Sequence, residues 1–366
     1  MKIAFALTVH KPEDDRVWYQ QAQALLESGH EVFIISARMK TFDRENVFCF
    51  DNTNLSHSEQ IDKFCDFLSE INPDIIICDN PVSVLASYKY KKTTKNRQLK
   101  IYYDITEYYP SKIHFHHASR TQNVIKFFVL CGVSFYTSLL VSGFIFGEHY
   151  KALPYKIFFW KKRVNLAYYA DLKHIKTYPV NENPEKFTMF FAGKMKEETG
   201  FPVFVNAAIE CAKQFQNINF ECRVVSTDIS SELTKNIGKN LTINFLPIIP
   251  FLDFCEKFGT SDIFFDLRDI DLENSHSLPI KLFYYMAAGR PVVYSRLKAI
   301  EQGVPEINKF GILVNPTNTS DVVNAISKYL SNKDLYRNHC ENARQLAEQK
   351  YNWENIKNQF VDFIVC

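Results

Sequence analysis

The stretch ENSHSLPIKLFYYMAAGRPVVYS, residues 273–295, decides the fold of this 366-residue chain. Its first half predicts a short apolar helix, with Ser277 placed to cap the N-terminus and Pro279 in the first turn. Gly289 stands where such a helix would end, and the apolar residues from Val292 onward predict a buried strand. A helix that leads into a strand buried on both faces is typical of a parallel α/β sheet. We therefore expect a helix–strand unit of a doubly wound domain here.

The same alternation of apolar runs and amphipathic segments surrounds this unit. Other runs of strand length in the C-terminal half occupy residues 188–192, 220–225, 242–246, 262–267 and 311–314. In the N-terminal half they occupy residues 2–9, 31–36, 74–78, 100–104 and 140–146. The pattern breaks between Lys161 and Asn183. The sequence thus predicts an α/β fold of two Rossmann-like doubly wound domains facing across a cleft, residues 1–168 and 169–350.

Composition and charge exclude several classes of protein. Apolar residues make up 46% and charged residues 23%, as in soluble globular proteins. The formal charge of +2 gives no general electrostatic reason to expect nucleic acid as a partner. The nine cysteines are scattered without a C-x-x-C pair, so neither a zinc site nor a disulfide framework is indicated. The apolar run before His10 is too short for a signal peptide, and we expect a cytoplasmic protein.

Several common catalytic signatures are missing from the sequence. No G-x-G-x-x-G follows the first predicted strand and no P-loop sequence occurs, which argues against dinucleotide cofactors and P-loop ATP use. No G-x-S-x-G or H-E-x-x-H occurs either, so neither a hydrolase triad nor a zinc protease is supported. The acid pairs Asp14–Asp15 and Asp269–Asp271 could hold a divalent ion, but paired acids are common in loops and we predict no metal.

The predicted helix after Ser277 offers a site for an anion. Its N-terminus presents free N–H groups with a partial positive charge, and Lys281 in the first turns adds a full charge. Both groups suit a diphosphate at the carboxyl edge of the sheet. Tyr284 lies on the same helix face as Lys281 and either lines a base or ribose pocket or packs in the core; both alternatives stay open.

This stretch resembles the donor-binding signature of GT-B glycosyltransferases, in particular the large retaining family 4. Weaker motifs of the same family follow in the expected order along nearly the whole chain. They are His10–Arg16 with Gly29–Val32, Tyr103–Glu107 (YDITE), Phe190–Lys194 (FFAGK), Phe310–Pro316 (FGILVNP) and Tyr351–Glu354 (YNWE). The resemblance implies transfer of a hexose from a UDP- or GDP-linked sugar, with retention of configuration and without metal or cofactor. It also implies that a last helix, residues 351–366, packs back toward the N-terminal domain.

The resemblance, the predicted helix end and the neighbouring cleft loops together suggest roles for particular residues. Those that would orient sugar and acceptor during catalysis are His10, Glu107 and His276. Those that would bind the donor are Gly193, Lys194, Arg268, Glu273, Ser277, Leu278, Pro279, Lys281 and Tyr284. Arg16 and Thr106 would lie on the acceptor side. Neutralising the charge of the leaving nucleotide diphosphate is the main catalytic task of such a site.

The sequence also departs from the family pattern. His276 and Tyr284 stand where relatives carry two glutamates, Thr199 precedes Gly200 where many have lysine, and Thr106 replaces a histidine. Loss of a charged hydrogen bond to a ligand costs about 1.5–3 kcal/mol. Arg268, Glu273, Lys196 and His276 could compensate. The alternative is a catalytically degenerate GT-B scaffold or binding subunit at the membrane; a sugar-nucleotide epimerase of the same fold is a third interpretation.

Two features concern membranes. Residues 127–146 lack charge over a length that could span a bilayer, but their Gly, Ser and Thr content favours a buried helix that leads into a core strand. Basic clusters at residues 89–100 and 151–163, with the aromatic segment 154–160, suit peripheral contact with anionic lipid at the inner face of the cytoplasmic membrane. Solvated loop charges explain these clusters equally well. The acceptor would then be a lipid-linked glycan or a surface-polysaccharide precursor.

Overall fold

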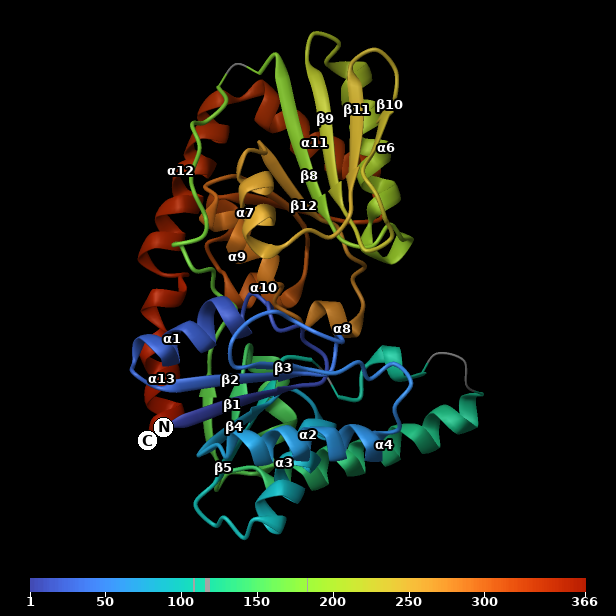
Figure 1. The fold of residues 1–366 in the computed structure, drawn as a ribbon. Helices are drawn as coiled ribbons and strands as arrows, with labels where there is room; N and C mark the ends of the chain where they lie inside the picture. The colour runs from blue at the N-terminus through green and yellow to red at the C-terminus, as the bar shows by residue number, and fades with distance from the viewer. Residues whose placement is uncertain (108, 116–118, 183) are drawn as a thin grey trace. The chain divides into compact units, whose positions relative to one another are not determined.

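A computed structural model of the chain describes residues 1–107, 109–115, 119–182 and 184–366. It divides the chain into two units (Figure 1). The N-terminal unit comprises Met1–Ala167 and Ile356–Cys366, and the C-terminal unit comprises Tyr168–Asn355. The chain thus passes into the C-terminal unit next to the expected boundary, and returns at Ile356 rather than at Tyr351.

The N-terminal unit is built on a parallel sheet of order β3-β2-β1-β4-β5-β6-β7. Its strands are β1 (Lys2–Leu7), β2 (Glu31–Ser36), β3 (Val47–Cys49), β4 (Ile75–Cys78), β5 (Lys100–Ile105), β6 (Gly143–Phe146) and β7 (Lys162–Asn165). Its helices are η1 (Val17–Ala22), α1 (Gln23–Glu27), α2 (His57–Ile71), α3 (Pro81–Thr93), η2 (Lys112–Phe115), α4 (Arg120–Leu140), α5 (His149–Ala152), η3 (Leu153–Ile157) and α13 (Lys357–Val365). Capping boxes at Ser56 and Asn80 begin α2 and α3.

The C-terminal unit repeats this architecture with the sheet order β10-β11-β9-β8-β12-β13-β14, in which β10 alone is antiparallel to its neighbour. Its strands are β8 (Lys186–Ala192), β9 (Asn219–Val225), β10 (Leu233–Asn236), β11 (Leu241–Leu246), β12 (Ile263–Asp266), β13 (Val292–Ser295) and β14 (Gly311–Val314). Its helices are η4 (Glu197–Thr199), α6 (Phe201–Gln214), α7 (Phe251–Gly259), α8 (Leu272–Ser275), α9 (Ile280–Ala287), α10 (Lys298–Gly303), η5 (Ile307–Lys309), α11 (Thr319–Ser331), α12 (Lys333–Gln349) and η6 (Trp353–Asn355).

Each strand of the C-terminal sheet contributes to two cores because successive side chains point to opposite faces. On β8, Phe190 packs with Tyr285 of α9 on one face, and Phe191 packs with Phe204 of α6 on the other. The prediction of two doubly wound sheets from alternating apolar runs is confirmed. The short strands β3, β7 and β10 were not predicted.

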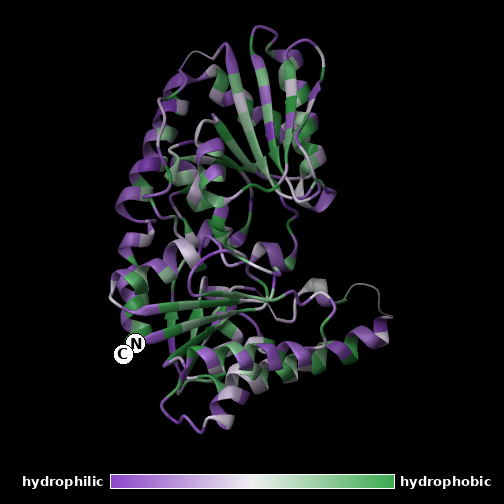
Figure 2. Cartoon of the chain, viewed as in Figure 1, coloured by the Kyte–Doolittle hydropathy of each residue, from purple (hydrophilic) through white to green (hydrophobic). Residues whose placement is uncertain are grey.

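The prediction for residues 127–146 is wrong in part. The strand begins only at Gly143, and the preceding residues form α4, a helix of 21 residues. Only 17% of the most apolar 18-residue stretch of this helix is buried, so α4 is not the core helix that we expected. Among the described residues it is the one helix long and apolar enough to cross a membrane. It contacts α3, but much of its length is open to solvent (Figures 1 and 2).

The last helix, α13, completes the N-terminal unit. Its Phe363 ring lies 5.1 Å from the ring of Tyr102 on β5, and the ammonium of Lys357 lies 3.2 Å from the carboxylate of Glu27 on α1. Gly143 makes room for this contact, because a Cβ there would lie 3.2 Å from Phe363 and 2.8 Å from a backbone oxygen of β7. The sheet of the N-terminal unit is therefore covered in part by the end of the chain.

Candidate active site

A buried cluster of charge in the C-terminal unit lies where β12 and β13 end. Asp266, the last residue of β12, is 4% exposed. Its carboxylate accepts a bidentate pair from Arg268 at 2.8 and 2.5 Å and a hydrogen bond from Tyr294 of β13 at 2.8 Å. The ammonium of Lys281 on α9 lies 3.1 Å from the same carboxylate. Two cations therefore share one buried anion.

The electrostatics of this cluster favour an anionic ligand. Burial would raise the pKa of Asp266, but the charges of Arg268 and Lys281 outweigh burial and hold it well below its usual range. Burial lowers the pKa of Lys281, and Asp266 opposes that effect. The side chains of Arg268 and Lys281 keep 24% and 25% exposure, so both can still reach a ligand. One positive charge remains uncompensated among these three groups.

Helix α9 begins later than the sequence predicts. It starts at Ile280 with Pro279 in the N-cap position, and Ser277 is not the cap. The Ser277 hydroxyl donates instead to the backbone oxygen of Glu273 at 2.9 Å. Proline has no side-chain acceptor, so no side chain caps the first turn of α9. Its first amides remain suited to an anion, as expected at an uncapped helix N-terminus.

The glycine that ends α9 is confirmed. Gly289 follows the last helical residues with a φ of 68°, in the left-handed region where glycine is favoured. Lys281, the second residue of the helix, also donates to the backbone oxygen of Ala192 at the end of β8. Lys281 thus links the ends of β8 and β12.

The loop after β8 carries the predicted Gly193 and Lys194. A Cβ at Gly193 would lie 4.0 Å from the Lys281 ammonium, whereas Lys194 is exposed to solvent. Thr199 fixes this loop, because its hydroxyl lies 2.6 and 2.8 Å from the backbone oxygens of Lys194 and Lys196. Gly200 has a φ of 71°, and a Cβ there would lie 2.1 Å from the oxygen of Leu267. Thr199 and Gly200 therefore shape the loop without adding charge.

The remaining predicted donor residues lie around α8 and α9. Asp271 caps α8, and His276 follows it with its Nδ1 atom 2.7 Å from the oxygen of Leu272. Glu273 and His276 are partly exposed on this one segment. Leu278 lies against Gly303, where a Cβ would come within 3.1 Å of it. These residues are close in sequence, and the structure keeps them on one short stretch before α9.

Tyr284 is a core residue. Its side chain is 3% exposed, and its ring packs on Phe251 of α7 with centroids 5.7 Å apart. Of the two alternatives for this tyrosine, core packing holds. The position offers no exposed ring for a base or ribose, so we no longer place Tyr284 in the donor site.

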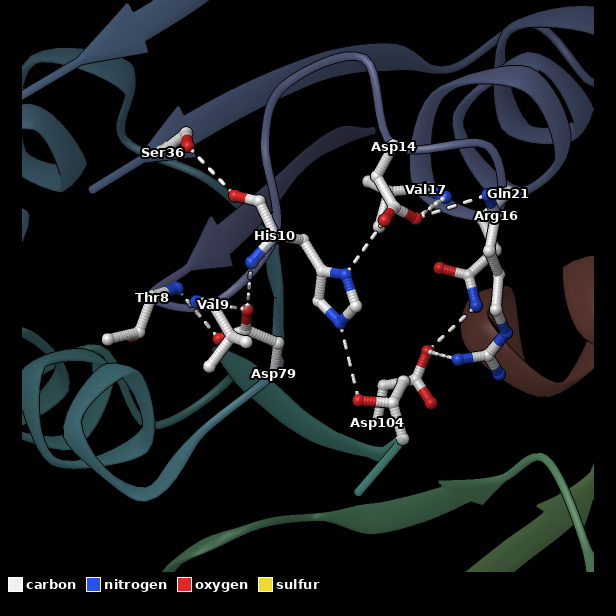
Figure 3. Close-up of polar contacts among 11 residues, drawn as sticks. Thr8, Val9, His10, Asp14, Arg16, Val17, Gln21, Ser36, Asp79 and Asp104 are labelled. Carbon is white, nitrogen blue, oxygen red and sulfur yellow. Dashed lines mark hydrogen bonds and ion pairs between the residues drawn. The ribbon is translucent and has the colours of Figure 1, made fainter. Parts of the chain in front are cut away.

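The predicted catalytic His10 lies in a polar network at the ends of β1 and β5 (Figure 3). Its Nδ1 atom lies 2.8 Å from the Asp14 carboxylate, and its Nε2 atom lies 3.3 Å from the Thr106 hydroxyl. The carboxylate of Asp79 holds the backbone of this loop by accepting from the amides of Thr8, Val9 and His10 at 2.8, 2.9 and 3.2 Å. The structure thus brings His10 and Thr106 together.

Arg16 belongs to the same network. It is 5% exposed and pairs with the Asp104 carboxylate at 2.7 Å, to which Gln21 also donates at 2.8 Å. Such a buried pair positions the loop rather than meeting an acceptor, so the acceptor-side role predicted for Arg16 becomes indirect. Glu107, just beyond β5, is exposed. Together with Thr106 it marks the carboxyl end of β5.

The pKa of His10 is raised to about 9. Burial alone would lower it, but the hydrogen bond to Asp14 and the negative charges of Asp14, Asp79 and Asp104 outweigh burial. The same contact with His10 holds the pKa of Asp14 below its usual range, against the effect of burial. At neutral pH the imidazole is therefore a charged hydrogen-bond donor, suited to orient a sugar or phosphate oxygen.

We expect this histidine to make stability depend on pH. Because its folded-state pKa lies above the ordinary 6.5, the stabilisation is complete below pH 6.5 and is lost as pH rises through about 9. The raised pKa of His10 corresponds to about 3 kcal/mol in the free energy of unfolding. Urea unfolding of the wild type and of His10→Gln from neutral to alkaline pH measures it: the stability gap should narrow as pH rises. A gap that stays constant would contradict the raised pKa.

Within the described residues no group of three His, Cys, Asp or Glu side chains could hold a metal ion. Asp14 accepts from the amides of Arg16 and Val17 as well as facing His10, and Asp271 caps α8. One acid of each pair, Asp14 and Asp271, therefore has a local structural role.

Sequence reasoning missed Asp266, Asp104 and Asp79 as organisers of the two sites. The first two lie at the ends of β12 and β5, and the third directly follows β4. The signal was present, since each acid comes at the end of an apolar run where parallel strands place their ligand sites. An ion-pairing partner could not be assigned from the run alone.

Several solved structures have the same fold as this chain and indicate the class of protein to which the fold belongs. A sucrose-phosphate synthase from Thermosynechococcus elongatus matches with a TM-score of 0.67, 13% identity and coverage of 98% of this chain and 97% of its own. The Anabaena protein HepE in complex with UDP-glucose matches with a TM-score of 0.68 and 14% identity over 99% and 98% of the two chains. An alpha-glucosyltransferase in complex with UDP and a 13-mer DNA matches with a TM-score of 0.65 and 13% identity over 100% of both.

The fold is thus that of the GT-B glycosyltransferases, and the chain is a glycosyltransferase. Residues 186–332, most of the C-terminal unit with Lys281 and Asp266, match the model of the family described as Glycosyl transferases group 1. No curated protein matches the chain in sequence. The family that the sequence resembles is therefore confirmed at the level of group 1 and of the GT-B fold.

Proposed function

We propose that this glycosyltransferase moves a hexose from a UDP-sugar to an acceptor hydroxyl. The observation that carries the proposal is the cluster of Arg268 and Lys281 on Asp266, next to the uncapped N-terminus of α9. A nucleoside diphosphate is the anion that best matches two partly exposed cations beside free helix amides. UDP is preferred to GDP because similar structures were solved with UDP or UDP-glucose.

In this reaction the leaving UDP gains negative charge. Lys281, Arg268 and the amides of α9 would stabilise that charge, which is the principal catalytic effect at such a site. Because the protein itself supplies these cations, we propose transfer without a metal ion. We also propose retention of the anomeric configuration, with the proton of the acceptor hydroxyl passing to the leaving phosphate. No dedicated base is then required.

The N-terminal unit would recognise the acceptor. The Nε2–H group of protonated His10, which faces the Thr106 hydroxyl at 3.3 Å, can donate to a sugar oxygen in its place, and Glu107 just beyond β5 can accept from a hydroxyl. We propose a glycan or a surface-polysaccharide precursor as the acceptor, and a cytoplasmic location. The nine cysteines are free thiols, which fits a reducing compartment.

Calorimetric titration with UDP, GDP and their glucose and mannose derivatives tests the proposal. We expect UDP and UDP-sugar to bind with micromolar affinity, about −8 kcal/mol, and GDP at least about tenfold more weakly. Product anomers, followed by NMR with and without EDTA, report retention and metal independence. Failure of the folded protein to bind any nucleotide would contradict the proposal and favour a degenerate scaffold.

A further inference from the structure

The N-terminal unit exposes an apolar surface of unusual extent. Of the 20 large apolar side chains exposed among the described residues, 12 belong to α4 and to residues 153–160. On α4 they are Val124, Ile125, Phe127, Phe128, Val129, Phe135, Tyr136 and Leu139. Beyond α4 they are Leu153, Ile157, Phe159 and Trp160. We call these twelve side chains the α4–η3 surface. Soluble monomers rarely expose large apolar patches, and those that do often use them to bind a partner or a membrane.

The two segments form one surface. Phe135 of α4 packs on Phe158, which follows η3, with ring centroids 5.3 Å apart. Phe158 in turn lies 5.8 Å from the ring of Trp160. Phe159 and Trp160 are 79% and 59% exposed, and their rings pack edge to face 5.1 Å apart. Exposed aromatic tips of this kind are typical of the interfacial region of a membrane.

The charge of this region matches an anionic lipid headgroup. Between residues 108 and 170 the sequence holds eight Lys or Arg and a single acid, Glu148. That acid is 6% exposed and pairs with Lys151 at 2.8 Å. Lys126, Lys156 and Lys162 are among the exposed bases beside the apolar surface. By contrast, Lys89 and Lys91 of the other basic cluster bond Asp62 and the oxygen of Leu99.

The strand topology shows that α4 does not cross a membrane. Helix α4 connects β5 to β6, which are parallel neighbours in one sheet with Tyr102 paired to Gly143. A helix that spanned a bilayer would hold the end of β5 and the start of β6 on opposite sides. The intact sheet excludes this arrangement, so any contact of α4 with a membrane would be interfacial.

A cavity of about 390 Å³ lies beneath this surface. Its lining is largely apolar and comes from α4, η3 and the segment after β5, including Phe127, Phe135, Pro110, Tyr155 and Phe158. Its charged lining residues are Glu107 and Lys151. A volume above 300 Å³ with an apolar wall and few polar groups is typical of a ligand site.

The cavity adjoins the His10 site. Glu107 and Ile105, which line it, flank Thr106, whose hydroxyl faces His10. The Lys151 ammonium, also in its lining, bonds the backbone oxygen of Thr106. A hydrocarbon chain in the cavity would therefore place an attached phosphate or sugar near His10.

We propose that the α4–η3 surface docks on an anionic bilayer and that the cavity receives the hydrocarbon chain of a lipid-linked acceptor. The acceptor part rests on the proposed function, whereas bilayer docking does not. Membrane lipid is the one occupant that matches all three features, which are the exposed aromatic side chains, the surrounding bases and the open apolar cavity. The substrate class is a lipid phosphate that carries a sugar or accepts one.

Vesicle sedimentation tests the docking. The full chain should bind phosphatidylcholine vesicles only when they contain phosphatidylglycerol, and tryptophan emission should shift to the blue. The double variant Phe159→Ser, Trp160→Ser should bind at least about tenfold more weakly. A matched control, Ile248→Ser with Leu252→Ser, removes two exposed apolar side chains of the C-terminal unit and should bind like the wild type. Equal binding by all three proteins, or none by the wild type, would overturn the proposal.

Calorimetry with farnesyl phosphate tests the cavity. Ser134→Phe fills it from α4, and Cys131→Leu is a smaller filling change on the same wall. Both should weaken farnesyl phosphate binding, the first by about tenfold or more, while UDP affinity stays unchanged. If UDP fails to bind but vesicles do, the proposed function is wrong and docking stands. Unchanged farnesyl phosphate affinity in both folded variants would refute the lipid cavity.

Discussion

Replacing Lys281 with methionine should weaken UDP binding by about 10 to 100-fold and lower kcat/KM by about 10³-fold or more. Lys281 lies 3.1 Å from Asp266, bonds the oxygen of Ala192 and belongs to the first turn of α9. Its removal would delete a positive charge that, in the proposed site, faces the diphosphate. It also leaves Asp266 with less compensation next to an anionic ligand, which adds repulsion.

Two further variants sharpen this experiment. Lys281→Arg retains the charge and should keep more of the UDP affinity than Lys281→Met. Lys213→Met removes an ammonium that is 66% exposed on α6, and it should behave like the wild type. Calorimetry reports affinity and donor turnover reports kcat/KM. UDP affinity of Lys281→Met within threefold of the wild type would place the diphosphate elsewhere.

The second large effect concerns stability. Asp266→Asn should destabilise the C-terminal unit by about 3–5 kcal/mol, because Arg268 and Lys281 would then repel each other around a buried neutral amide. Tyr294→Phe, which removes only one hydrogen bond to the same carboxylate, should cost about 1 kcal/mol. Urea unfolding measures both differences, and UDP should restore part of the loss in Asp266→Asn by supplying a new anion.

Equal free energies of unfolding for Asp266→Asn and the wild type would show that solvent, and not the carboxylate, neutralises the two cations. The comparison with Tyr294→Phe separates the loss of charge from the loss of a hydrogen bond. Circular dichroism of the variant at low temperature establishes that any loss of UDP binding arises in a folded protein.

The sequence predicted the core of the fold well because burial on both faces leaves a clear apolar pattern. The stretch from Ile280 to Ser295 forms the expected helix, left-handed glycine and strand. The cap was misplaced because a cap depends on backbone angles as well as residue type, and Pro279 occupies the N-cap with extended angles. Helix α4 was misjudged because a charge-free run looks the same whether its apolar side chains meet a core or a surface.

The departures from the family pattern have structural explanations that no single motif contains. Thr106 faces His10 at 3.3 Å, Thr199 fixes the loop after β8, and Tyr284 packs in the core. Asp266 escaped prediction for a related reason. A carboxylate at a strand end gains its role only from partners on β13 and α9, which lie far along the chain and are brought together by the sheet order.

The return of α13 to the N-terminal unit bears on the order in which a ribosome delivers the chain. Domains made first usually fold first. Here the N-terminal unit lacks the helix that covers Tyr102 until residues 356–366 are synthesised, whereas the C-terminal unit is one continuous stretch. The half of the protein that is translated second can therefore finish folding before the half that is translated first. During that interval the nascent N-terminal sheet keeps an open face, and chaperones that bind apolar surfaces would meet it there.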